Sequence, residues 1–160
     1  MNKGRYKKIV VPVDGSGLSR RAIPHAVDIA NSNDSEIILL HVFRPPANEY
    51  SDIIALAGQS TQVDEVREQV KQYLIGIRND LRNEGLDTRV QMIEGANTAT
   101  LICDYVNGED VDLVVMSTRG HTGIARFVFG SVAQKVLHAV RVPVMLVYPD
   151  DETGTRSAES

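Results

Sequence analysis

The sequence has little cysteine, few aromatic residues and no long apolar run. Its single cysteine, Cys103, excludes an intramolecular disulfide framework and is typical of a chain kept in a reducing cytosol. No stretch approaches the roughly 20 consecutive apolar residues of a membrane-spanning helix. The basic amino terminus lacks the apolar segment of a signal peptide. We therefore expect a cytoplasmic protein that does not insert into membranes.

Excess positive charge is also missing, since 17 Lys and Arg face 21 Asp and Glu, for a net charge of -4. Nucleic acids and anionic membranes normally need a basic face, so neither is expected as a partner. The sequence has no G-x-x-x-x-G-K-[ST] motif and no G-x-G-x-x-G after its first apolar run. No spacing of His, Cys and Asp indicates a metal site beyond Mg²⁺ accompanying a nucleotide. A Ser-His-Asp elbow is absent too.

What the 160 residues do contain is a regular alternation of apolar runs and helical patterns. The apolar runs predict five strands, at residues 7–13, 35–45, 87–95, 112–117 and 142–149. Helices are expected between them, at residues 19–32, 63–81, 97–111 and 131–140. Solidly apolar strands that alternate with helices predict an α/β fold, a parallel sheet with helices on both faces. Right-handed crossovers favour a doubly wound five-stranded sheet in the order 3-2-1-4-5.

We expect a single domain over residues 1–149, followed by a disordered polar tail at residues 150–160. Within the domain, Pro24 predicts a bend or a late start of the first helix. Residues 45–62 have no clean period and are expected to form a variable excursion.

Two further signals concern the ends of helices. Ser16 or Ser19 is expected to cap the first helix. Gly85 is expected to end the long helix that carries the apolar stripe from Val63 to Leu81.

A ligand site is expected at the carboxyl ends of the first and fourth strands, where the strand order reverses. The two most glycine-rich loops, "PVDGSG" and "MSTRGHTG", meet there. Gly120 allows close backbone approach to an anion, and Gly130-Ser131 opens a helix whose N–H groups and Ser131 hydroxyl suit a phosphate. Asp14 is an acceptor suited to ribose hydroxyls, and Val42 is placed to contact a base. Together these residues indicate a nucleotide cradle, although ordinary strand-to-helix turns look similar.

Other chemically capable residues have simpler interpretations. Arg119, His121 and Arg126 are expected to be solvated loop residues, with charge-assisted phosphate contact as the alternative. His41 lies in a buried strand and is expected to be a hydrogen-bonded core residue. Cys103 falls in the apolar pattern of a helix and is expected to be a buried small residue.

The opening residues of the second glycine-rich loop resemble the universal stress protein family. That family has the pattern G-x-x-G, nine residues, then G-[ST], and here "STRG" is followed by residues 121–129 and then by Gly130-Ser131. "KKIVVPVDGS" is similar to the family's first strand and its Asp, "EIILLHV" to its second strand and "VPVMLV" to its last. The resemblance covers roughly residues 5–148. One departure is Ser117, which stands where the pattern has its first glycine.

The resemblance implies a protein that binds ATP, or AMP or ADP, with Mg²⁺, as a regulatory switch in stress response. It implies ribose contact at Asp14, base contact near Pro12, Val13 and Val42, and phosphate contact at the glycine pattern. The full set of implied binding residues is Pro12, Val13, Asp14, Val42, Met116, Ser117, Gly120, Gly130, Ser131 and Val132.

The resemblance also implies a homodimer paired through the last strand, whose exposed edge is otherwise an association hazard. It implies an unidentified client protein as a further partner. Two alternatives remain open. One is a slow ATP hydrolase, for which neither loop offers an evident base. The other is a dimeric interaction module that has lost nucleotide binding, for which Ser117 is the support.

Overall fold

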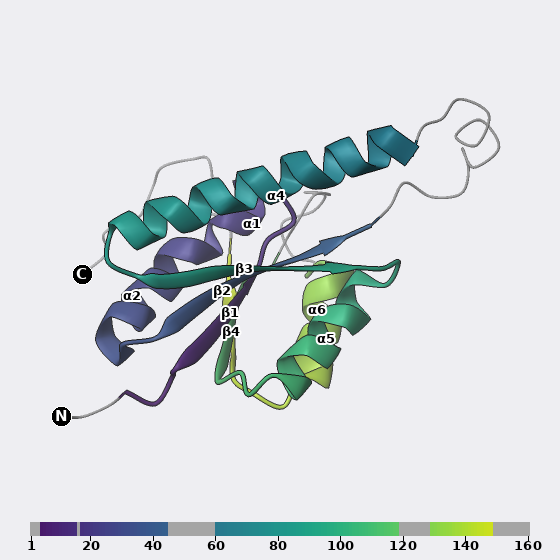
Figure 1. Cartoon of the computed structure of the whole chain (residues 1–160). Coiled ribbons are helices and arrows are strands. Elements are labelled where there is room, and N and C mark those ends of the chain that lie inside the picture. Colours follow the sequence, from purple (N-terminus) through teal and green to yellow (C-terminus); the bar gives the residue numbers. More distant parts are fainter. Residues whose placement is uncertain (1–3, 16, 45–59, 119–128, 149–160) are drawn as a thin grey trace, which may run out of the picture.

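The structure is a computed structural model that describes residues 4–15, 17–44, 60–118 and 129–148. A five-stranded sheet with the order β3-β2-β1-β4-β5 forms its centre (Figure 1). The strands are β1 (Lys8–Pro12), β2 (Glu36–Phe43), β3 (Asp87–Glu94), β4 (Leu113–Ser117) and β5 (Val144–Val147). All neighbouring strands pair in parallel. The predicted fold class and strand order are confirmed, while the tail predicted at 150–160 lies outside the described residues.

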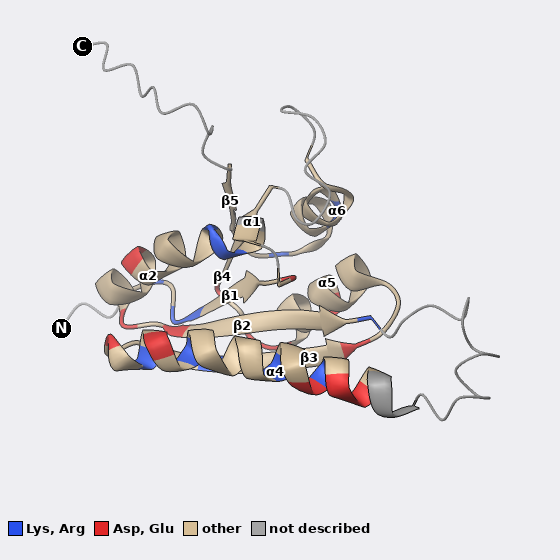
Figure 2. Ribbon diagram, turned by 90° about the horizontal axis from the view of Figure 1, so that it is seen from above, with Lys and Arg blue, Asp and Glu red and all other residues tan. Residues whose placement is uncertain are grey.

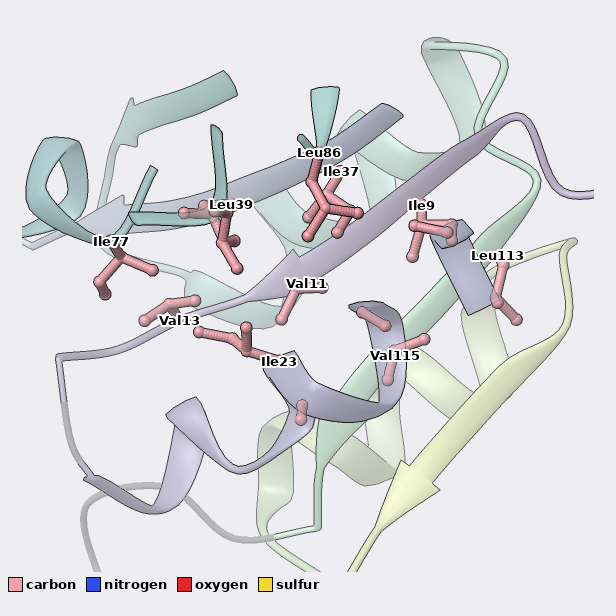
Figure 3. Packing of buried hydrophobic residues seen from close by; sticks show 14 of the residues in the cluster. Ile9, Val11, Val13, Ile23, Ile37, Leu39, Ile77, Leu86, Leu113 and Val115 are labelled. Carbon is pink, nitrogen blue, oxygen red and sulfur yellow. The ribbon is translucent and has the colours of Figure 1, made fainter. Parts of the chain in front are cut away.

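Helices cover both faces of the sheet. On one face lie α1 (Gly17–Arg20), α2 (Ala22–Asn33) and α4 (Ser60–Asn83), and on the other lie α5 (Thr98–Gly108) and α6 (Ser131–Ala139) (Figure 1). Because successive strand residues point to opposite faces, Val11 and Val10 belong to different core clusters. Figure 3 shows the first cluster, in which Val11 packs among residues of α2, α4 and neighbouring strands. The second cluster lies against α5 and α6.

The first helical region begins in two steps. α1 ends at Arg20, and α2 begins after Arg21, so Pro24 falls in the first turn of α2. A first-turn residue has no intrahelical partner for its N–H, which is why proline is tolerated there and the predicted late start is confirmed. The predicted cap of the first helix is Ser16 or Ser19. Ser16, the residue before α1, lies outside the described residues, so this stays a prediction. Ser19 lies within α1, and its hydroxyl accepts a hydrogen bond from the Asp14 N–H at 3.2 Å.

The carboxyl end of α4 is closed by two nested backbone hydrogen bonds. Gly85 has φ +87°, and its N–H donates to the Arg82 carbonyl at 2.9 Å. The Leu86 N–H donates to the Leu81 carbonyl at 3.1 Å. This is a Schellman motif, and it confirms Gly85 as the helix terminator. Residues 45–59 of the predicted excursion lie outside the described part of the chain.

The outer surface of α4 carries charges of both signs (Figure 2). Arg67 pairs with Asp64 at 2.5 Å and with Glu94 of β3 at 3.0 Å. Its guanidinium carbon also lies 5.1 Å from the centre of the Phe43 ring, at the end of β2. These contacts hold the first half of α4 against the carboxyl ends of β2 and β3. None of the described helices is long and apolar enough to cross a membrane.

Candidate functional site

The carboxyl ends of β1 and β4 lie side by side where the strand order reverses. Val10 pairs with Val114, so three residues further along each strand Val13 is level with Ser117. Asp14 follows Val13 and is exposed. The two glycine-rich loops therefore begin side by side at the carboxyl ends of β1 and β4, as the strand order requires.

The amino end of α6 is joined to this edge. The Gly130 N–H donates to the Thr118 carbonyl at 2.8 Å, and Thr118 in turn donates to the Val147 carbonyl at 3.0 Å. α6 begins at Ser131, and Gly130 precedes it without a side-chain cap. The N–H groups of the first helical turn and the positive end of the helix dipole therefore lie beside the end of β4. Ser131 is exposed and Val132 is partly buried.

The apolar members of the predicted set that lie on β1, β2 and β4 or directly follow β1 are buried. Val13 belongs to the core cluster under α2 and α4, whereas Val42 and Met116 belong to the cluster under α5 and α6. Pro12 is also buried. These buried side chains lie beneath the surface at the carboxyl ends of the strands. A ligand would reach Met116 through its backbone rather than through its side chain.

His41 is a hydrogen-bonded core residue, as predicted. Its Nδ1 lies 2.6 Å from the Val13 carbonyl oxygen, and the Val13 N–H donates to the Leu40 carbonyl at 2.8 Å. The β1–β2 ladder ends at the pair Pro12 and Leu40, so Val42 lies beyond it. In a strand, every second residue directs its N–H and C=O groups to the same neighbouring strand. The Leu40 carbonyl is bonded to the Val13 N–H, so the N–H and C=O of Val42 point to the same side, beyond the last residue of β1.

Thr118 is a residue that the sequence reasoning missed. It is 2% exposed, and its hydroxyl has no hydrogen-bond partner in the part of the chain that the structure describes. Its signal in the sequence is a hydroxyl inside "STRG", at a position that the glycine pattern does not specify. Gly120, Arg119, His121 and Arg126 lie outside the described residues.

Two further predictions concern cysteine and metals. Cys103 is buried, as expected, with its Sγ 3.9 Å from the Lys135 carbonyl oxygen. Burial raises the pKa of the Cys103 thiol, and the nearby Lys135 ammonium only partly opposes this effect. Among residues 4–15, 17–44, 60–118 and 129–148, no group of three or more His, Cys, Asp or Glu could hold a metal ion.

The chain is a doubly wound α/β domain in which the loops after β1 and β4 begin side by side at the strand reversal, the point where ligands bind in folds of this class. The universal stress protein family matches residues 5–148, and the chain belongs to this family. A curated relative, universal stress protein MJ0531 of Methanocaldococcus jannaschii, is 32% identical over 145 residues. The match spans 89% of this chain and 82% of the relative.

Solved structures of the family share the fold. The protein MJ0577, also of Methanocaldococcus jannaschii, superposes with a TM-score of 0.78 at 24% identity, over 92% of this chain and 99% of that one. An Arabidopsis thaliana family protein with AMP bound has a TM-score of 0.61 at 18% identity, covering 94% and 97%. The Archaeoglobus fulgidus universal stress protein in complex with dAMP also has a TM-score of 0.61, at 22% identity, covering 89% and 98%. Structural relatives thus bind adenine nucleotides.

Proposed function

We propose that this protein is a cytosolic universal stress protein that binds ATP, or AMP or ADP, as a regulatory switch in stress response. One observation carries the proposal: the ends of β1 and β4 and the amino end of α6 meet at the strand reversal. Relatives that hold AMP and dAMP support an adenine nucleotide as the ligand. The cytosolic location rests on a single cysteine, buried at Cys103.

In this proposal the phosphates lie at the amino end of α6, where backbone N–H groups and the dipole favour an anion. Ser117, Gly120, Gly130, Ser131 and Val132 are the contacts that we propose for them, and Mg²⁺ would accompany the triphosphate. Met116, which directly precedes Ser117 in β4, is a further proposed contact through its backbone.

The nucleoside would lie across the end of β1. The exposed carboxylate of Asp14 is the proposed acceptor for the ribose hydroxyls. The Val42 backbone, which faces the line of β1 beyond the end of that strand, is the proposed contact to the base. Pro12 and Val13 would support the base from below, since both are buried.

The test is the nucleotide content of the purified protein, followed by calorimetric titration with ATP in the presence and absence of Mg²⁺. We expect bound adenine nucleotide or saturable ATP binding, which Gly130→Asp abolishes because a carboxylate at the end of α6 repels phosphate. Gly76→Asp introduces the same charge at an open position of α4 and serves as the matched control, with unchanged binding. No bound nucleotide and no heat would refute the proposal. Phosphate release well above background would instead identify slow hydrolysis.

We also propose a homodimer that pairs through β5. This strand lies at one end of the sheet order, and Met145 on it is 38% exposed. Tyr148, directly after the strand, is 64% exposed. An apolar edge strand is usually covered or charged in a monomer.

Light scattering during gel filtration tests the dimer. We expect the protein to elute as a dimer and Met145→Lys to shift it to monomer, because charge on an edge strand opposes pairing. Val66→Lys places the same charge on an exposed apolar position of α4 and should leave the dimer intact. A monomeric parent protein would contradict this part of the proposal.

A further inference from the structure

Thr118 lies directly after β4 and in contact with the start of α6. Its N–H donates to the Val147 carbonyl at 3.0 Å, and its carbonyl accepts from the Gly130 N–H at 2.8 Å. Four residues earlier, the Val114 N–H donates to the Pro143 carbonyl, also at 3.0 Å. Thr118 therefore continues the strand's pattern, in which side chains point alternately to the two faces of the sheet. Its side chain therefore lies on the same face as Val114, which is the face that α5 and α6 cover.

The hydroxyl of Thr118 has no hydrogen-bond partner among the residues that the structure describes. Both main-chain groups are engaged, yet Oγ1 has no hydrogen bond within the described ranges. Thr88 offers a comparison, because it is 0% exposed and its hydroxyl donates to the Leu86 carbonyl at 3.3 Å. Buried hydroxyls nearly always have such a partner, so the unpaired one beside a helix amino end calls for an explanation.

We propose that the missing partner is a phosphate of the bound nucleotide, with Thr118 Oγ1 donating to a phosphate oxygen held at the amino end of α6. This inference rests on the function proposed above and adds a ligand-binding residue to it. Gly130 presents no side chain to cap α6, and its N–H bond to the Thr118 carbonyl holds Thr118 beside the first N–H groups of that helix, which favour an anion. In a site shielded from water, a hydrogen bond to an anion is strong because solvent does not compete for it.

The decisive variant is Thr118→Val, which keeps the shape of the side chain and removes the hydroxyl. Without ligand, its melting temperature should rise, because a buried polar group with no partner is lost. Its affinity for AMP should fall about ten- to hundredfold, the effect of losing one hydrogen bond to a charged group. Its affinity for adenosine, which has no phosphate, should not change. Thermal melts and calorimetric titrations with AMP and with adenosine measure all three quantities.

The matched control is Thr88→Val, the same substitution at an equally buried threonine whose hydroxyl has a partner. It should lower the melting temperature, because the Leu86 carbonyl loses its donor, and it should leave AMP affinity unchanged. Thr118→Ser retains the hydroxyl and should keep most of the AMP affinity. If Thr118→Val does not fold, comparing Thr118→Ser with Thr118→Ala isolates the hydroxyl in the same way.

The outcomes separate this inference from the function on which it rests. Equal AMP affinity in the parent and in Thr118→Val would overturn the inference and leave the proposed function standing. Equal losses for AMP and for adenosine would also overturn it, because the hydroxyl would then act through packing. A parent protein that binds neither AMP nor ATP would overturn both.

Discussion

Ser117, the last residue of β4, stands where the family pattern has its first glycine. It is 7% exposed and level with Val147 in the sheet. We expect Ser117→Gly to lower the free energy of unfolding by about 0.5–1 kcal/mol, since glycine loses more conformational freedom in a strand. ATP affinity should change little, because the proposed phosphate donors also include the Ser131 hydroxyl and the N–H groups of the first turn of α6. Urea denaturation and calorimetry measure the two effects.

A different result at Ser117 would be informative. If Ser117→Gly bound ATP and the parent protein did not, the serine Cβ would be blocking the site. That outcome would support the alternative of an interaction module that has lost nucleotide binding.

The second prediction at this scale concerns Cys103. Burial raises the pKa of its thiol, so the folded protein holds the proton at a pH where the unfolded chain releases it. The contribution to stability is complete below the unfolded pKa of about 8.5 and declines as the pH rises above it. At pH 8 the native protein should react with iodoacetamide far more slowly than the urea-unfolded protein, as followed by mass spectrometry. Similar rates in the two states would contradict the burial of this thiol.

At the scale of elements, two glycines of the α4 region allow a matched test. Gly76 lies within α4, and a Cβ there would meet nothing within 4 Å. Gly76→Ala should raise the free energy of unfolding by about 0.5–1 kcal/mol, because alanine favours a helix over glycine. Gly85 has φ +87° in the Schellman motif, so Gly85→Ala should destabilise by about 1 kcal/mol. Chemical denaturation of both variants gives the two values, and shifts of the same sign would contradict the assigned end of α4.

The elements show which parts of the fold the sequence predicts well. Continuous apolar runs identify the central strands β1, β2 and β4, because a parallel sheet buries both faces of such strands. The edge strand β3 has polar residues between its apolar ones. Glycine and proline act locally, and so Gly85 and Pro24 indicate helix ends correctly. The hydrogen bond that the Ser19 hydroxyl accepts from the Asp14 N–H was not predicted. Spacing in sequence does not reveal which of several nearby N–H groups a hydroxyl will meet.

The candidate site was predictable to a similar degree. The strand reversal and the glycine pattern indicate its location, because topology alone decides which loops are neighbours. Thr118 was not found, since its significance depends on burial against α6 and on the absence of a partner in the described chain. Those properties arise only when distant segments pack. The roles of the site residues remain predictions.

At the scale of the whole molecule, a carboxylate that joins two strands lies at the opposite end of the sheet from the proposed ligand site. The Asp112 carboxylate accepts hydrogen bonds from the Lys7 N–H at 2.8 Å and from the Lys8 N–H at 2.9 Å. This residue joins the amino ends of β1 and β4, far from the proposed ligand. Asp112→Ala should therefore lower the free energy of unfolding by about 1–3 kcal/mol, because two backbone donors lose their acceptor.

The same variant should bind ATP normally at temperatures where it is folded. Denaturation curves and calorimetry at 15 °C or below check the two expectations separately. Asp112→Asn keeps an oxygen acceptor and should be less harmful, so it is the control. A loss of binding in a fully folded Asp112→Ala protein would show that the two ends of the sheet are energetically coupled.

The pairing of β1 with β4 has a consequence for how the protein is made. β1 is synthesised before every other strand of the sheet, but its neighbour on one side begins only at Leu113. In a nascent chain, the side of β1 that pairs with β4 therefore stays unpaired until β4 has been synthesised. Contacts between segments so far apart in sequence slow folding. Because the proposed site needs β1, β4 and the start of α6 together, we expect nucleotide to stabilise only a chain that has been synthesised beyond Ser131.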